Sequence, residues 1–123
     1  MLLKIAESCA PSQKGLTRAY STYQRCRQYI EDNCHRLRSL EQIARECRID
    51  HSYLCRLFHR HEHQTPYRLL MRLKMNLAAE RLQTSNILVK QVATELGFDD
   101  PFHFSRSFKN VFGLSPESFR HLR

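Results

Sequence analysis

The stretch VATELGFDDPFHFSRSFKNVFGLSP, residues 92–116, repeats a pattern that occurs once earlier in the chain. The earlier copy, IARECRIDHSYLCRLFHRHEHQTP at residues 43–66, has matching apolar, arginine and Ser/Thr-Pro positions. The offset is 49 from Ile43 to Asp50 and becomes 50 after one inserted residue. Each copy predicts a short helix, a tight turn, a second helix and a newly capped helix, which is the helix-turn-helix pattern.

Apolar residues that recur every three or four positions predict helices along the rest of the chain. A first helix is expected over about 21–33, and a long helix is expected over about 66–84 between the two copies. Ser39 with Gln42 forms a capping box ahead of the second helix. Later helix starts are marked by Asp50, Thr65-Pro66, Asp100-Pro101 and Ser115-Pro116.

These elements give an all-α fold of about seven helices, in which two helix-turn-helix subdomains are joined by a long linker helix. The first copy is expected over about 21–64, the linker helix over about 66–84 and the second copy over about 86–123. Residues 1–20 are expected to be an N-terminal tail or a linker from an upstream domain, because a short apolar segment there precedes a polar one.

Length and composition narrow the classes of function. The 123 residues suit one compact domain, and 20 Lys+Arg against 12 Asp+Glu give a net charge of +8, which favours a polyanionic partner. Five cysteines without a C-x-x-C spacing indicate reduced thiols rather than a disulfide scaffold. No long apolar run and no signal-peptide start are present, so we expect a cytoplasmic protein with no membrane partner.

Residues 92–116 resemble the signature of the arabinose-operon-regulator (AraC/XylS) family of bacterial transcription regulators, and the resemblance covers about residues 21–123. It implies two recognition helices in successive major-groove segments of double-stranded DNA. We expect no enzymatic activity and no cofactor. The resemblance also implies dimerisation through an upstream domain in many members, and RNA polymerase as a second partner of an activator.

The chain departs from the family pattern at two turns. Arg48 and His63 stand where the family often has a small residue or glycine, whereas the second copy has Gly97 and Gly113 there. A residue other than glycine in a left-handed conformation costs about 1 kcal/mol. We therefore expect the first copy to be the less regular one.

A recognition helix buries one face and offers the other to DNA. We expect Leu54, Leu57 and Phe58 to point inward in the first copy, and Phe104, Phe108 and Val111 in the second. Arginine can bind a guanine edge with two hydrogen bonds, serine can bond to any base, and phenylalanine can contact a thymine methyl. The residues matched to the family's base-contacting positions are His51, Ser52, Cys55, Arg56, Phe102, Ser105 and Arg106.

Each of these residues also has a purely structural interpretation. Arg56 and Arg106 could form surface salt bridges, Phe102 could pack into the core, and Cys55 could be a buried small residue. Helix N-termini and basic side chains predict phosphate contacts, although Arg36 and Arg38 could equally lie in a solvated loop. The expected phosphate-contacting residues are Arg36, Arg38, Ser39, Leu40, His59, Leu88, Lys90 and Lys109.

Other classes of function fit the sequence less well. Cys55, His59 and His63 could share a helix face, but zinc sites need three or four converging ligands, so we expect no metal. No phosphate-binding glycine loop, cleft carboxylate pair or nucleophilic triad is present, so we expect no enzyme. Single-stranded RNA binding would need an open sheet. The alternative to sequence-specific binding is a non-specific nucleic-acid-binding module.

Overall fold

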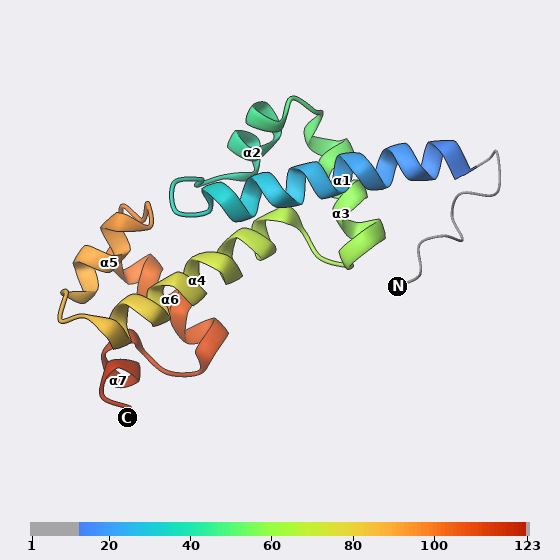
Figure 1. The fold of residues 1–123 in the computed structure, drawn as a ribbon. Helices are drawn as coiled ribbons and strands as arrows, with labels where there is room; N and C mark the ends of the chain where they lie inside the picture. The colour runs from blue at the N-terminus through green and yellow to red at the C-terminus, as the bar shows by residue number, and fades with distance from the viewer. Residues whose placement is uncertain (1–12, 123) are drawn as a thin grey trace.

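The computed structural model describes residues 13–122, which form seven α-helices and no strand (Figure 1). The expected all-α fold with about seven helices is therefore confirmed for this part of the chain. None of these helices combines the length and the hydropathy that crossing a bilayer requires. The helices are α1 (Gln13–Asn33), α2 (Leu40–Cys47), α3 (His51–Glu62), α4 (Pro66–Thr84), α5 (Val89–Glu95), α6 (Pro101–Phe112) and α7 (Pro116–Arg120).

The first helix begins eight residues earlier than the sequence pattern predicted. It starts at Gln13 rather than near 21, so part of the expected tail at 1–20 is helical, and residues 1–12 lie outside the described residues. The extra turns give α1 a longer contact with the C-terminal half of α3. Ala19 is buried, and the rings of Tyr20 and His61 lie 5.2 Å apart.

Polar residues cap five helices as predicted. Ser39 Oγ accepts a hydrogen bond from Gln42 N, and Asp50 accepts hydrogen bonds from the backbone amides of Ser52 and Tyr53. Thr65, Asp100 and Ser115 cap α4, α6 and α7 in the same way. Because Asp50 and Asp100 occupy the same place, the residue inserted in the second copy is Asp99. The sequence alignment had paired Asp50 with Asp99, which was wrong.

The tight turn of each copy has the same backbone conformation. Ile49 N donates to Ala44 O in the first copy, and Phe98 N donates to Ala93 O in the second. Both hydrogen bonds close over a left-handed residue, Arg48 with φ 61° or Gly97 with φ 87°. The second helix of each copy also ends on a left-handed residue, His63 with φ 58° or Gly113 with φ 80°. The predicted irregularity of the first copy is thus limited to two strained residues, and the two copies have the same turn geometry.

Two separate cores pack against opposite ends of α4 (Figure 1). The first lobe, formed by α1, α2 and α3, contributes Ile30, Ile43 and Phe58 to a core that Leu69 and Leu70 complete. The second lobe, formed by α5, α6 and α7, packs Val92, Phe104 and Phe108 against Met75, Ala78 and Leu82. Leu73 and Leu77 of α4 are half-buried.

The left-handed turns predict opposite stability effects in the two copies. His63→Gly should raise the free energy of unfolding by about 1 kcal/mol, because glycine adopts this conformation without a Cβ clash. Gly113→Ala should lower the free energy of unfolding by about 1 kcal/mol. A Cβ at Gly113 would meet no atom within 4 Å, so this loss measures the cost of the left-handed backbone conformation alone.

Urea denaturation of each variant measures these effects, with His63→Ala as the matched control. His63→Ala removes the same imidazole but keeps the Cβ, so its stability should stay near that of the wild type. Equal gains for alanine and glycine at residue 63 would show that the imidazole, and not the backbone conformation, is unfavourable.

Candidate nucleic-acid interface

The first recognition helix, α3, buries one face and exposes the opposite one. Leu54, Leu57 and Phe58 are buried as predicted, and Asp50 fixes the start of the helix. The outward face carries groups that can donate and accept hydrogen bonds, with the half-buried Cys55 at its edge. Burial raises the pKa of the Cys55 thiol, so it stays protonated. The exposed residues of this face are His51, Ser52, Arg56 and His59.

The second recognition helix, α6, has the same division. Phe104 and Phe108 are buried as predicted, and Ser105 is half-buried while Arg106 and Lys109 are exposed. Phe102 is 72% exposed, so it does not pack into the core. An exposed aromatic side chain in the first turn of such a helix is available for an apolar contact with a partner.

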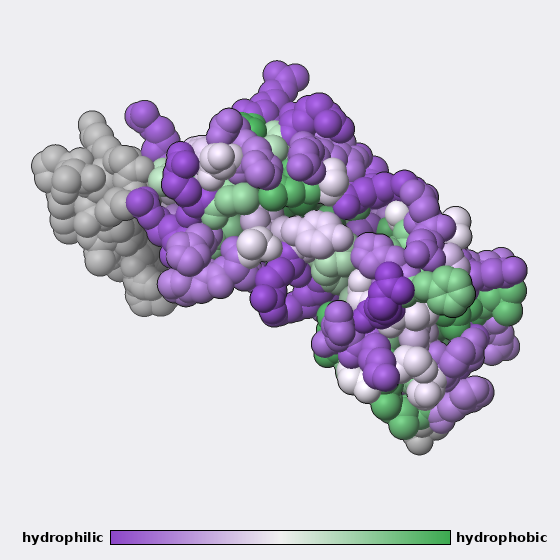
Figure 2. All heavy atoms as spheres, turned by 180° about the vertical axis from the view of Figure 1, so that it is seen from behind, coloured by the Kyte–Doolittle hydropathy of each residue, from purple (hydrophilic) through white to green (hydrophobic). Residues whose placement is uncertain are grey.

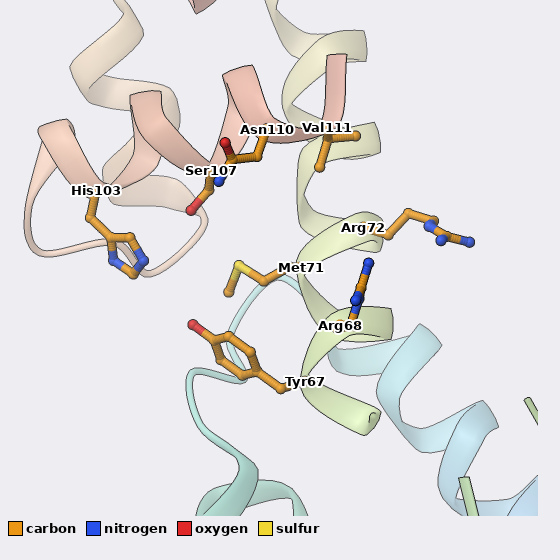
Figure 3. A pocket seen from close by; sticks show the side chains of 8 residues that line it. All are labelled: Tyr67, Arg68, Met71, Arg72, His103, Ser107, Asn110 and Val111. Carbon is orange, nitrogen blue, oxygen red and sulfur yellow. The ribbon is translucent and has the colours of Figure 1, made fainter. Parts of the chain in front are cut away.

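Val111 was expected to face the core, and this prediction was wrong. It is 43% exposed because it lines a groove beside the last turn of α6. The groove has a volume of about 310 Å³ and runs between α4 and α6 (Figure 3). Tyr67 and Met71 extend from α4 and His103 and Ser107 from α6 toward this space. Sequence reasoning missed the groove, although Tyr67 and Met71 lie one turn apart on the same face of the long helix by their spacing.

The two matched arginines are not held by acidic neighbours. No ion pair between residues 13–122 includes Arg56 or Arg106. The Arg56 guanidinium lies over the Tyr53 ring, 5.7 Å from its centroid, which orients the side chain without neutralising its charge. Within the described part of the chain, the salt-bridge alternative is therefore not realised for either arginine.

Arg36 and Arg38 lie exposed in the connection between α1 and α2, and each has an acidic partner there. Arg36 Nη2 donates to Glu46 Oε1 at 2.7 Å and to the Tyr29 hydroxyl at 2.8 Å. Hydrogen bonds, chiefly from Arg36, hold the pKa of Glu46 at about 2. Arg38 lies 3.2 Å from Asp99, across the gap between the two lobes. A phosphate contact by either arginine would compete with these pairs.

The other expected phosphate contacts lie at helix N-termini or on the recognition helices. Ser39 and Leu40 are half-buried at the start of α2, and the Ser39 hydroxyl oxygen is already used as a cap. Leu88 is 54% exposed just before α5, where Gln91 Oε1 accepts a hydrogen bond from its amide, and Lys90 is exposed.

The histidines near the end of α3 do not converge with Cys55 on a metal site. His61, on α3, packs against α1, with its ring 4.8 Å from that of Tyr23. Burial, with a smaller effect of Arg60, lowers the pKa of His61, which favours the neutral ring. Among residues 13–122, no group of three or more His, Cys, Asp or Glu side chains could hold a metal ion.

Both recognition helices lie toward the same side of the molecule. In Figure 1, α1 crosses in front of α3 and α4 crosses in front of α6. The view from behind therefore presents α3 and α6, and hydrophilic side chains cover most of that face (Figure 2). The two recognition helices thus face one side of a chain whose net charge is +8. This arrangement suits an extended polyanion.

Comparison with known proteins gives matches to one kind of domain. A family model described as a helix-turn-helix domain matches residues 43–121. The raffinose operon transcriptional regulatory protein of Pediococcus pentosaceus is 34% identical over 92 residues, which are 75% of this chain and 33% of the relative. The MmsAB operon regulatory protein of Pseudomonas aeruginosa is 30% identical over 92 residues, 75% of this chain and 30% of the relative.

A solved structure has the same fold. The C-terminal domain of AraT, a response regulator from Geobacillus stearothermophilus, superposes with a TM-score of 0.77 at 29% sequence identity. The superposition covers 83% of this chain and 85% of that domain. The chain spans about a third of the length of the curated relatives, so it is comparable to one domain of those proteins.

Proposed function

The chain belongs to the AraC/XylS-type helix-turn-helix domains, which are DNA-binding domains of transcription regulators, and we propose that it reads DNA with both copies at once. In this proposal α3 and α6 enter successive major-groove segments on one face of the duplex. The two recognition helices, which we call the two readers, are both supported by α4. They bind two short blocks of base pairs that differ in sequence, because the base-reading residues of the two copies differ.

The observation that carries the proposal is that the lobes containing α3 and α6 pack at opposite ends of one linker helix, α4. α4 has 19 residues and is therefore about 28 Å long. Successive major-groove segments on one face of B-DNA are about 34 Å apart. A helix of this length with one lobe packed at each end can therefore hold two readers near the required separation.

The proposed roles follow the chemistry of the exposed side chains. Arg56 and Arg106 bind guanine edges, and Phe102 contacts a thymine methyl. His51, Ser52, Cys55 and Ser105 complete the base-reading set. His59 and Lys109 lie one turn further along their helices and bind phosphates. The N-terminal amides of α2 and α5 add phosphate contacts, together with Arg36, Arg38, Ser39, Leu40, Leu88 and Lys90.

The rest of the regulator is proposed by analogy with the longer relatives. A further domain would bind an effector or mediate dimerisation, and an activator would contact RNA polymerase. The family consists of DNA-binding regulators and not of enzymes. We place the protein in the bacterial cytoplasm, where its DNA target lies.

Binding to duplex DNA should weaken steeply with salt. The lysines and arginines that neutralise phosphates release condensed counterions. The logarithm of the association constant should therefore fall linearly with the logarithm of the salt concentration, with a slope that corresponds to several phosphate contacts. Fluorescence anisotropy with a labelled duplex between 50 and 200 mM salt measures this slope. A flat response would contradict the proposal, because no phosphate contact would then contribute.

The two arginines should each read one block of the site. On the best site selected from random DNA, Arg56→Ala and Arg106→Ala should each weaken binding by about 1–3 kcal/mol. Each change should relax base preference only in the block beneath its own helix. Repeating the site selection with each variant, and titrating the selected site, gives both quantities.

Lys109→Ala is the matched control for Arg106→Ala, since it removes a charge from the same helix. It should weaken all sequences alike and make the salt slope shallower, as expected for a phosphate contact. If both arginine variants instead weaken binding to all sequences equally, the two arginines contact phosphates and do not read bases.

A further inference from the structure

Lys74, in the middle of α4, is a buried charge that the reading of DNA does not use. Its exposed fraction is 1%, and it is the one charged or polar residue that is fully buried among the described residues. It lies at the boundary of the two cores, since Leu70 belongs to the first core and Met75 to the second. Burial lowers the pKa of the Lys74 ammonium to about 8.

The ammonium of Lys74 is bonded to both lobes. Its Nζ donates to the carbonyl oxygen of His35 at 3.4 Å and to the carbonyl oxygen of Leu96. His35 belongs to the connection between α1 and α2, whereas Leu96 follows the last turn of α5. The Phe98 ring of the second lobe lies 5.9 Å from the same nitrogen. One side chain on the shared helix α4 thus connects the backbones of the two lobes.

The connection occurs where the two lobes approach each other. Figure 1 shows the α1–α2 connection and the α5–α6 connection meeting beside the middle of α4. Arg38 pairs with Asp99 at the same place, but their side chains are 54% and 85% exposed. Exposed ion pairs contribute little to stability, because water screens them. The buried hydrogen bonds of Lys74 are therefore the stronger directional link across this junction.

A buried ammonium lowers stability relative to an apolar side chain of similar size, so a lysine here requires a different advantage. Methionine at this position could fill the same space but could not hold two carbonyl oxygens at a fixed angle. The hydrogen bonds of the ammonium are directional, and their acceptors lie on loops that move with their own lobes. The rotation of one lobe about α4 relative to the other is therefore restricted at this residue.

We propose that Lys74 is a positioning residue that fixes the orientation of the second helix-turn-helix relative to the first, and thereby the spacing of the two DNA blocks that the chain accepts. The effect on spacing rests on the proposed function, whereas the effect on orientation does not. One added base pair rotates the second block by about 35° and moves it by about 3.4 Å. A rigid pair of readers cannot follow this change, and a loosely joined pair can.

The orientation is tested without DNA, by residual dipolar couplings of the backbone amides of the full chain. In the wild type one alignment tensor should fit the couplings of both lobes. Lys74→Met should require two tensors of different magnitude, whereas Lys74→Arg, which retains a charged donor, should keep one. Arg72→Met is the matched control, since it removes an exposed charge from the same helix and should also keep one tensor.

The spacing is tested with duplexes in which one base pair is added or removed between the two selected blocks. The wild type, Lys74→Arg and Arg72→Met should lose about tenfold in affinity with each altered spacing, which is comparable to the loss of base contacts. Lys74→Met should lose only about twofold, while its affinity for a duplex with a single block stays unchanged.

The outcomes separate the two proposals. A folded Lys74→Met with a single tensor and the wild-type spacing profile would overturn the role of Lys74. Absence of DNA binding by every variant, with two tensors for Lys74→Met, would refute the proposed function but keep the positioning role. Lys74→Gln is the second variant, shorter and uncharged, and should behave like Lys74→Met. If both unfold the chain, Lys74 supports the cores themselves and the proposal is wrong.

Discussion

The burial of α4 by two different cores is the constraint on which the rest of the molecule depends. Leu69 and Leu70 complete the core of the first lobe, and Met75, Ala78 and Leu82 complete that of the second. Each lobe has three helices, and the apolar residues of α4 complete the core of each. Both recognition helices are therefore supported by one helix, whose length sets their separation.

The repeat is preserved in backbone conformation more strictly than in side chains. Arg48 and His63 adopt the left-handed conformations that Gly97 and Gly113 adopt in the second copy. The turn between α2 and α3 therefore has the conformation of the turn between α5 and α6, even though arginine disfavours it. His63 likewise ends the first recognition helix in the conformation in which Gly113 ends the second.

The parts of the structure that follow from local chemistry could be predicted from the sequence, and those that depend on distant partners could not. Capping residues such as Asp50 and Thr65 mark helix starts because their acceptors lie two or three residues away. The N-terminal turns of α1 were missed, because the segment around Gly15 has the polar composition of a linker. The partners of Arg36 and Arg38, and the two carbonyls that hold Lys74, come from other elements of the fold, so no local pattern reveals them. The exposed arginines Arg56 and Arg106 lie where the pattern put them, and their contact with bases stays a prediction.

The central claim is that one chain places two readers on one face of a duplex. Hydroxyl-radical footprinting of the monomeric chain on its selected site tests it most directly. Our account predicts two short protected blocks, about one helical turn apart, on the same face and without palindromic symmetry between their sequences. Protection confined to a single block would contradict the account, because the second helix-turn-helix would then pack against α4 without entering the groove.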